Sequence, residues 1–306
     1  MKKKESKSRT VSPAVFDISW REKFSPALSQ WPPRRLLVAL DPSPASAIAW
    51  KEAGILAKIW GAEIEGVHVQ PWLWTSTSEF GYADPQLTAQ TSEEISAGLR
   101  QRLGIPGDIA SFPGDPVEEI VRWSEANPFD MLVLGTQSRS GLARSFHSSV
   151  AEAIVRRSSM PVLVVKNPLK RPSSVLAPYD LRPESRPGLY AAVACAKTLG
   201  ASLTILHAVR SPGAEVSGSL PHLKKDVLDG ISDVPDTAKP EHVEVEIAWG
   251  KPISEILEAS QRFDLIVLTA RSRGFLEDSI LGTTAERVIR HGMASVLAVP
   301  DSEILA

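Results

Sequence analysis

The feature of this 306-residue sequence that most limits its fold is an internal repeat. The run LLVALD, ending at Asp41, has a counterpart in VLAPYD, ending at Asp180, and IEGVHV, with His68, has one in LTILHAV, with His207. Both pairs lie 139 residues apart. Later landmarks recur in the same order at offsets of 136 and 134 residues, as small loop insertions would produce. Such self-similarity predicts two copies of one folding unit.

The later landmarks extend the repeat to the end of the chain. PGDPVEEI matches WGKPISEI, FDMLVLGTQSRSG matches FDLIVLTARSRGF, and the segment around Ser149 matches the segment around Thr283. A chain of this length also exceeds one ordinary compact core. We therefore expect a first domain at residues 34–168 (repeat 1), a second at 169–306 (repeat 2), and an N-terminal arm at 1–33. The junction at 167–172 is short and contains two prolines, which predicts that the domains pack together.

Each repeat alternates apolar runs of strand length with segments of helical periodicity. In repeat 1 the pattern predicts strands at 35–40, 63–69, 108–112, 130–135 and 161–166, and helices at 44–60, 86–103, 116–126 and 148–158. In repeat 2 it predicts strands near 174–178, 202–209, 242–248, 264–269 and 295–299. Runs such as LLVAL and LIVLT are almost wholly apolar, as strands buried on both faces of a parallel sheet are. The expected fold class is α/β, with two repeated doubly wound domains.

Composition excludes several other classes of protein. Hydrophobic residues make up 43% and charged residues 23%, and the net charge of −2 gives no basic excess for nucleic acid. The apolar runs are too short to span a bilayer, and no apolar stretch follows the basic first nine residues as in a secretory signal. The single cysteine, Cys195, is expected to be a small buried apolar residue. These features predict a soluble cytoplasmic protein without nucleic-acid or membrane partners.

The sheet architecture predicts where a ligand would bind. Open α/β sheets bind ligands at the carboxyl ends of strands that flank the topological switch point. The first and fourth strands would bring Asp41 to Gly135 in repeat 1 and Asp180 to Thr269 in repeat 2. The helices that follow the fourth strands are expected to start at Ser148-Ser149 and Gly282-Thr283, where exposed N–H groups attract anions. The alternative is that these acidic and hydroxyl residues only cap helices.

The stretch from Asp130 to Val165 resembles the C-terminal signature of universal stress protein domains, and repeat 2 resembles a diverged copy. The resemblance covers residues 34–300. It implies five parallel strands in the order 3-2-1-4-5 in each domain, and dimers formed through the last strand. It also implies a role in stress survival and regulation without a defined catalytic reaction.

The resemblance further implies a phosphate-binding pattern, G-x2-G-x9-G-[S/T], after the fourth strand of nucleotide-binding members. Each repeat of this chain keeps about half of the pattern. The matching positions are Gly135, Ser138, Ser148 and Ser149 in repeat 1, and Thr269, Ser272, Gly282 and Thr283 in repeat 2. A side chain at a glycine position costs on the order of 1 kcal/mol, enough to weaken binding about tenfold. We therefore expect a degenerate nucleotide site in each repeat, with ATP or AMP and Mg²⁺ as the candidate ligands and no cofactor assigned.

Other positions of the family's pocket have matches in this chain. Asp41 and Asp180 correspond to the acidic residue near the ribose, and Val69 and Ala208 to the main-chain contact with adenine. Gly114 and Gly250 begin the family's G-x-P segment. No nucleophile or carboxylate is placed by sequence beside His68 or His207, so both are expected to be structural.

Three functions remain as alternatives. The first is a non-catalytic regulatory protein that works through its surfaces with unidentified protein partners. The second is an ATP- or AMP-binding switch with weak hydrolysis. The third is an enzyme on the same fold, which is disfavoured because the sequence contains neither a P-loop motif nor a pyrophosphatase motif. The apolar last strands, 162–165 and 296–299, are expected to pair antiparallel within the chain as a pseudo-two-fold internal dimer. A homodimer of whole chains is left open.

Overall fold

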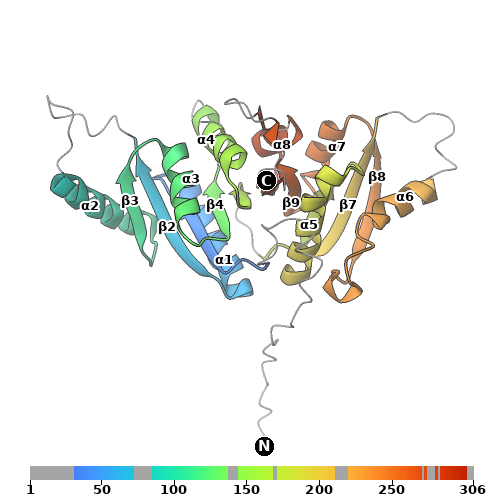
Figure 1. Ribbon diagram of the computed structural model, residues 1–306, viewed down its shortest axis with the longest axis horizontal. Coiled ribbons are helices and arrows are strands. Elements are labelled where there is room, and N and C mark those ends of the chain that lie inside the picture. Colours follow the sequence, from blue (N-terminus) through green and yellow to red (C-terminus); the bar gives the residue numbers. More distant parts are fainter. Residues whose placement is uncertain are drawn as a thin grey trace, which may run out of the picture.

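The computed structural model describes residues 31–71, 85–136, 144–167, 171–210, 220–270, 272–273, 280–281 and 283–301. Figure 1 shows these residues as two similar α/β halves lying side by side, with α4 and α8 next to each other between them. The boundary expected at 168/169 and nearly all of the arm lie outside the described residues.

The order of elements repeats as the sequence predicts. Repeat 1 contains β1 (Arg35–Ala39), α1 (Pro44–Trp60), β2 (Glu63–Gln70), α2 (Pro85–Leu103), β3 (Ile109–Pro113), α3 (Pro116–Ala126), β4 (Met131–Gly135), α4 (Arg144–Arg157) and β5 (Val162–Val165). Repeat 2 contains β6 (Ser174–Pro178), η3 (Pro183–Ser185), α5 (Arg186–Leu199), β7 (Ser202–Val209), α6 (Leu220–Asp229), η5 (Asp236–Ala238), β8 (Val243–Trp249), α7 (Pro252–Ala259), β9 (Leu265–Ala270), β10 (Ser272–Arg273), β11 (Ile280–Leu281), α8 (Thr283–His291) and β12 (Ser295–Pro300).

The main strands form one ten-stranded sheet in the order β3-β2-β1-β4-β5-β12-β9-β6-β7-β8. Within each half of this sheet all pairs are parallel, and the order is 3-2-1-4-5 when the strands of this sheet are counted from the start of each repeat. The expected fold class and strand order are therefore confirmed.

The two halves join through their last strands. β5 and β12 pair antiparallel, with Val164 opposite Val296 and Leu163 opposite Leu297. Leu297 is the counterpart of Leu163, 134 residues along the chain, so the approximate two-fold axis passes between these two residues. The expected antiparallel pairing is confirmed, and the sheet edge that each repeat would expose alone is covered by the other.

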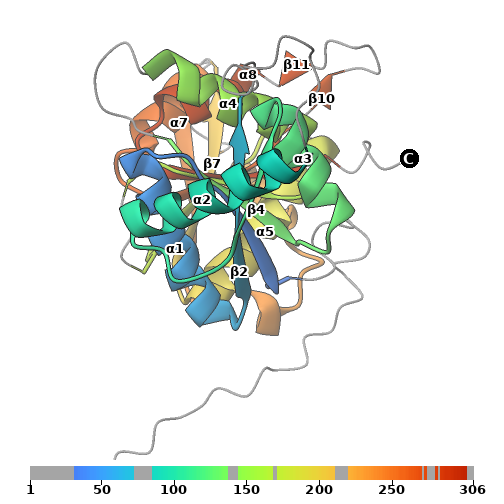
Figure 2. The ribbon, with the colours of Figure 1, turned by 90° about the vertical axis from the view of Figure 1, so that its left-hand side faces the viewer.

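A hydrophobic core lies on each face of the sheet, and both cores run through both repeats. One core packs β1, β4, β5, β6, β9 and β12 against α1 and α5, while the other packs the same strands against α3, α4, α7 and α8. Strands β4, β5 and β12 are buried on both faces, which explains their continuous apolar runs. Figure 2 shows the helices layered on both sides of the sheet.

An aspartate before the fourth strand fixes the start of the first strand in each repeat. Asp130 Oδ2 accepts from the backbone nitrogens of Arg34 and Arg35 at 2.7 and 2.9 Å. Asp264 Oδ2 accepts from the backbone nitrogens of residues 173 and 174 at 2.8 and 3.1 Å and from both of their hydroxyls. Burial alone would raise the pKa of Asp264, but these four hydrogen bonds prevail and lower it. This contact accounts for the recurring Phe-Asp landmark.

Three details differ from, or add to, the sequence expectations. The expectation that the helix after the fourth strand starts at Ser148-Ser149 was wrong, because α4 starts at Arg144. Ser148 and Ser149 therefore lie in the second turn of α4, where the backbone N–H groups bond to preceding carbonyls. The antiparallel pair β10–β11 was not expected. Trp31, within the expected N-terminal arm, is 3% exposed, and its ring lies edge-on to Trp60 with centroids 5.4 Å apart.

None of the helices in the described part of the chain combines the length and the apolar character needed to cross a membrane.

Candidate functional site

At the carboxyl end of β1, Asp41 organises the loop that leads into α1. Its Oδ1 accepts from the hydroxyls of Ser43 and Ser46, both at 2.5 Å, and from the Ser43 backbone nitrogen at 3.1 Å. Ser43 is the N-cap of α1, so Asp41 supports the cap without being the cap itself. The Asp41 carboxylate, expected near a ribose, therefore already has hydrogen-bond donors from its own chain.

Gly135 ends β4 directly beneath the first turn of α1. A Cβ at this position would lie 2.2 Å from the carbonyl oxygen of Ala45 and 3.1 Å from the backbone nitrogen of Ser46. The structure thus brings Gly135 and Asp41 to the same turn, as expected. The glycine is required here because the helix packs against the strand, whether or not a ligand binds.

Repeat 2 uses the same plan with different chemistry. Asp180 Oδ1 accepts from the Ser185 hydroxyl at 2.6 Å and from the Arg182 backbone nitrogen at 3.2 Å. Thr269, at the position of Gly135, donates its hydroxyl to the Ser185 carbonyl oxygen at 3.2 Å and accepts from the Gly188 backbone nitrogen at 2.8 Å. Asp180 and Thr269 therefore meet at Ser185.

The positions expected to contact adenine lie on the second strand of each repeat, next to the G-x-P loops. Val69 is on β2 and Ala208 on β7, and the Gly114 and Gly250 backbone nitrogens donate to the carbonyls of Gln70 and Val209 at 2.8 and 2.9 Å. A Cβ on Gly114 would lie 2.4 Å from Glu119 Cγ, and one on Gly250 would lie 2.0 Å from Glu255 Oε1. In both repeats a glutamate from the following helix covers the glycine.

His68 and His207 have the same partner in each repeat, the carbonyl one residue beyond the first strand. His68 Nδ1 lies 2.7 Å from the oxygen of Leu40, and His207 Nδ1 lies 2.8 Å from the oxygen of Tyr179. Because a carbonyl can only accept, Nδ1 carries the hydrogen in both rings. The contacts tie the second strand to the loop after the first, which agrees with a structural role.

The remaining predicted site residues fall on the segments between the fourth strand and the last helix. Ser138 and Gly282 lie outside the described residues. Ser272 is in β10, and Thr283 begins α8 as expected, whereas α4 begins four residues before Ser148. β11 contacts α4, so this part of repeat 2 reaches the neighbouring repeat.

In repeat 2 a backbone donor at the start of the first helix already has a partner within the chain. At the first turn of α5 the Gly188 N–H, the type of donor that a phosphate oxygen accepts from, is taken by Thr269. In repeat 1 the space beside Gly135 is filled by the α1 backbone instead, since a Cβ there would lie 2.2 Å from the Ala45 oxygen. In repeat 1 the corresponding strand end carries no such side chain.

Sequence reasoning missed two serines that organise the loop after the first strand in both repeats. Ser46 and Ser185 each follow the first-strand aspartate by five residues and hydrogen-bond to it. The D-x4-S spacing recurs at the same 139-residue offset as the aspartates, and this repetition could have identified them.

A second polar cluster lies at the interface between the repeats. Glu152 on α4 is 3% exposed and accepts from Arg290 Nε and Nη2 on α8 at 3.0 and 2.5 Å. Lys166 Nζ, after β5, donates to the carbonyl oxygens of Val288 and Gly292 at 2.8 and 2.6 Å, capping the end of α8. Burial lowers the pKa of Lys166 to about 7, against the opposing effect of the Glu152 carboxylate.

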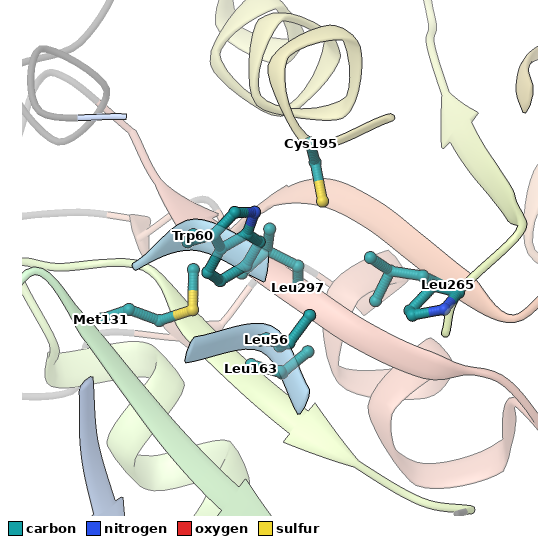
Figure 3. Close-up of a pocket in the computed structure, with 8 residues that line it drawn as sticks. Leu56, Trp60, Met131, Leu163, Cys195, Leu265 and Leu297 are labelled. Carbon is teal, nitrogen blue, oxygen red and sulfur yellow. The ribbon is translucent and has the colours of Figure 1, made fainter. Parts of the chain in front are cut away.

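Beneath the paired strands, apolar side chains from both repeats converge on a small cavity (Figure 3). Its lining is Leu56, Trp60, Met131, Leu163, Pro172, Cys195, Leu265 and Leu297. The free volume is about 10 Å³, which is at the limit for one water and too small for a nucleotide. Cys195 is 1% exposed, and burial raises the pKa of its thiol to about 12. The cysteine is therefore a buried apolar residue, as expected.

Comparison with known proteins agrees with the duplicated fold. The model of the universal stress protein family matches the chain twice, at residues 33–166 and 173–300. The chain belongs to the universal stress protein family. Both halves of the molecule are therefore family domains, and the fold class inferred from the strands is that of the family.

Individual relatives cover one domain or both. A universal stress protein of Methanocaldococcus jannaschii is 29% identical over 147 residues, covering 45% of this chain and 84% of the relative. One from Mycobacterium tuberculosis is 24% identical over 218 residues, covering 68% of this chain and 72% of the relative. The crystal structure of a universal stress protein from Archaeoglobus fulgidus matches 87% of this chain and 98% of its own, at 24% identity and a TM-score of 0.65. That likeness supports the tandem fold.

Proposed function

We propose that this chain is a non-catalytic, cytoplasmic stress-response protein in which two domains, 34–168 and 169–306, form an internal dimer, each with a degenerate nucleotide site. The observation that carries the proposal is that the acidic groups expected near a ribose in both repeats already have partners. Asp41 is bonded to Ser43 and Ser46, and Asp180 to Ser185 and the Arg182 backbone. At the Oδ1 atoms, a ribose hydroxyl would have to compete with these bonds, which weakens binding there.

The internal dimer supports action through surfaces. The family is expected to form dimers through the last strand, and here β5 and β12 already satisfy each other within one chain. Protein partners would therefore meet the helices or the outer strands, β3 and β8, since these strands end the sheet. A homodimer of whole chains would have to use the same surfaces.

Calorimetric titration with ATP and with AMP, in the presence of Mg²⁺, tests the degenerate sites. We expect no tight binding by the unmodified chain, and stronger binding by the variants Ser138→Gly and Ser272→Gly if a Cβ at the glycine positions is the obstacle. A dissociation constant of about 1 µM or below for the unmodified chain would contradict the proposal.

A second candidate is an ATP- or AMP-binding switch with weak hydrolysis. Gly135 and the two G-x-P loops favour it, because these residues match the pattern expected of nucleotide-binding members of the family. Release of inorganic phosphate from ATP by the full chain, abolished by substitutions in one crevice, would favour the switch over the non-catalytic protein.

A further inference from the structure

The ten-stranded sheet ends at β3 in repeat 1 and at β8 in repeat 2. Figure 1 shows these two strands at opposite ends of the molecule. In the described part of the chain, no further strand of the sheet lies beyond either of them. An unpaired strand edge is a template on which another extended chain can form backbone hydrogen bonds. Whether an edge can serve in this way depends on which of its backbone groups point outward.

The hydrogen bonds at the two ends of β8 show which of its residues point outward. The Leu203 backbone nitrogen donates to the His242 oxygen, and the Gly250 nitrogen donates to the Val209 oxygen, both at 2.9 Å. Successive residues of a strand direct their backbone groups to opposite sides, so the even-numbered residues of β8 face β7. The odd-numbered residues direct their N–H and C=O groups away from the sheet. These residues, which we call the β8 edge, are Val243, Val245, Ile247 and Trp249.

The outer edge of β3 is less open. The Gly66 nitrogen donates to the Asp108 oxygen at 3.1 Å, so by the same alternation the odd-numbered residues of β3 point outward. They are Ile109, Ser111 and Pro113. Pro113 has no N–H, and a proline on an edge strand blocks the addition of another strand. β3 has five residues and β8 has seven, so β8 is the longer and more open of the two edges.

Solvent reaches every residue of β8, although most of its side chains are apolar. None of the seven residues is buried, and Trp249 is 37% exposed. Val243, Val245 and Ile247 pack against the core on the side of α5, which holds the strand in place. A strand added to this edge would cover the exposed part of these apolar side chains while it paired with their backbone groups.

The opposite face of β8 carries acidic side chains. Glu244 is exposed, and Glu246, with 36% of its side chain exposed, accepts from Arg262 at 2.7 Å. Glu246 is the middle residue of the strand, so two copies of β8 paired antiparallel over their full length would place their Glu246 side chains opposite each other. Like charges directly opposite destabilise a strand pair, and opposite charges stabilise it. The β8 edge therefore disfavours its own copy and favours a basic strand.

We propose that the β8 edge binds an extended segment of a partner protein in which lysine or arginine alternates with apolar residues. The segment adds to the sheet as one more strand, and its backbone pairs with the odd-numbered residues of β8. Its apolar side chains continue the face of Val245 and Ile247, and its basic side chains lie across from Glu244 and Glu246. The inference rests on the proposed function, because it names the partner of a protein that acts through its surfaces.

Fluorescence anisotropy with labelled peptides tests the charge preference of the β8 edge. The basic probe has four lysines alternating with three valines, and the acidic probe has glutamate in place of lysine. We expect the full-length chain to bind the basic probe with a dissociation constant of about 100 µM or below, and the acidic probe at least about tenfold more weakly. Glu244→Lys should reverse this preference. Asp108→Lys, which makes the same charge change beside β3, is the matched control and should leave it unchanged.

Hydrogen exchange of the backbone amides shows whether the basic probe adds as a strand. In the free chain the outward amides of Val245 and Ile247 should exchange faster than those of Glu244 and Glu246, which face β7. Saturation with the probe should slow exchange at Val245 and Ile247 by at least about tenfold. Val245→Pro removes one outward N–H and no bond to β7, so it should weaken binding of the probe at least about tenfold. Ser111→Pro makes the same change on β3 and should have no effect on binding.

Several outcomes would overturn the inference. They are failure of the basic probe to bind at about 1 mM, equal binding of the two probes, and unchanged exchange at Val245 and Ile247. Dimerisation of the chain that Val245→Pro abolishes would identify a second copy as the occupant instead. If thermal melting shows that Val245→Pro does not fold, Glu244→Lys decides, since Glu244 is exposed. Loss of the β8 edge would leave the degenerate nucleotide sites standing, and tight nucleotide binding in the calorimetric titration would refute those sites without affecting the edge.

Discussion

The ion pair between Glu152 and Arg290 connects α4 of repeat 1 to α8 of repeat 2, and Glu152→Gln removes its negative charge with almost no change in volume. The Glu152 side chain is 4% exposed and the Arg290 side chain 46% exposed. Breaking a fully buried pair costs about 3–5 kcal/mol, and an exposed pair contributes at most about 1 kcal/mol. Since one partner is half-exposed, we expect the free energy of unfolding to fall by about 1–3 kcal/mol.

The chain provides a matched control for this substitution. Glu286 contacts the same Arg290 at 3.1 Å, but from within α8 at i,i+4 spacing and with 29% of its side chain exposed. Glu286→Gln should therefore cost no more than about 0.5 kcal/mol. Both variants keep a side chain of the same length, so the difference reports the contact between the repeats.

Urea unfolding of the two variants, of Arg290→Met and of the double variant Glu152→Gln/Arg290→Met gives the coupling energy of the pair. The two cores run through both repeats, so a single transition is expected. Equal losses for Glu152→Gln and Glu286→Gln, or a coupling energy below about 0.5 kcal/mol, would show that the pair does not hold the repeats together.

Three further predictions follow from single residues. Gly135→Ala should destabilise the chain by at least about 2 kcal/mol because its Cβ would collide with the backbone of α1. Gly98→Ala is the control, since open space surrounds that position, and it should be neutral or stabilising. Chemical denaturation of both variants measures the difference. Trp31→Ala should cost about 3 kcal/mol or more, and Trp249→Ala, at a site 37% exposed, much less, as thermal melting would show. The pKa of Lys166 is about 7 in the folded chain and 10.5 in the unfolded chain, so between these values the unfolded chain binds more protons. The free energy of unfolding should therefore rise with pH from pH 7 to about 8.5, by up to about 1.4 kcal/mol per pH unit. Lys166→Met should remove that slope.

Much of the fold could be predicted because its signals are local and occur twice. Apolar runs gave the strands nearly to the residue, and helix α1 was predicted with its observed ends, 44 and 60, because Pro44 begins it and Gly61 ends it in the left-handed conformation. The antiparallel pairing of the last strands followed from their apolar edges. The start of α4 was misplaced because Ser148 and Ser149 resemble capping residues, although the helix already begins at Arg144.

The candidate site was predictable only in part. The sequence placed Asp41 with Gly135 and Asp180 with Thr269 at equivalent ends of the sheet, and the structure brings each pair to one turn. It did not indicate Ser185 as the common partner of Asp180 and Thr269, because that depends on how closely α5 approaches β9. The role of Lys166 was also hidden, since its two acceptors lie more than 120 residues away.

The sequence by itself determined the duplication, the alternation of strands and helices, and which strands are buried on both faces. Each of these follows from patterns of apolar residues that are visible in short segments and recur in both halves of the chain. Tertiary structure decided which backbone groups each side chain reaches. Gly135 and Thr269 occupy equivalent positions, yet one allows the helix to touch the strand and the other bonds to the helix start. That difference depends on how closely each helix approaches its strand, which is a contact between residues far apart in the sequence.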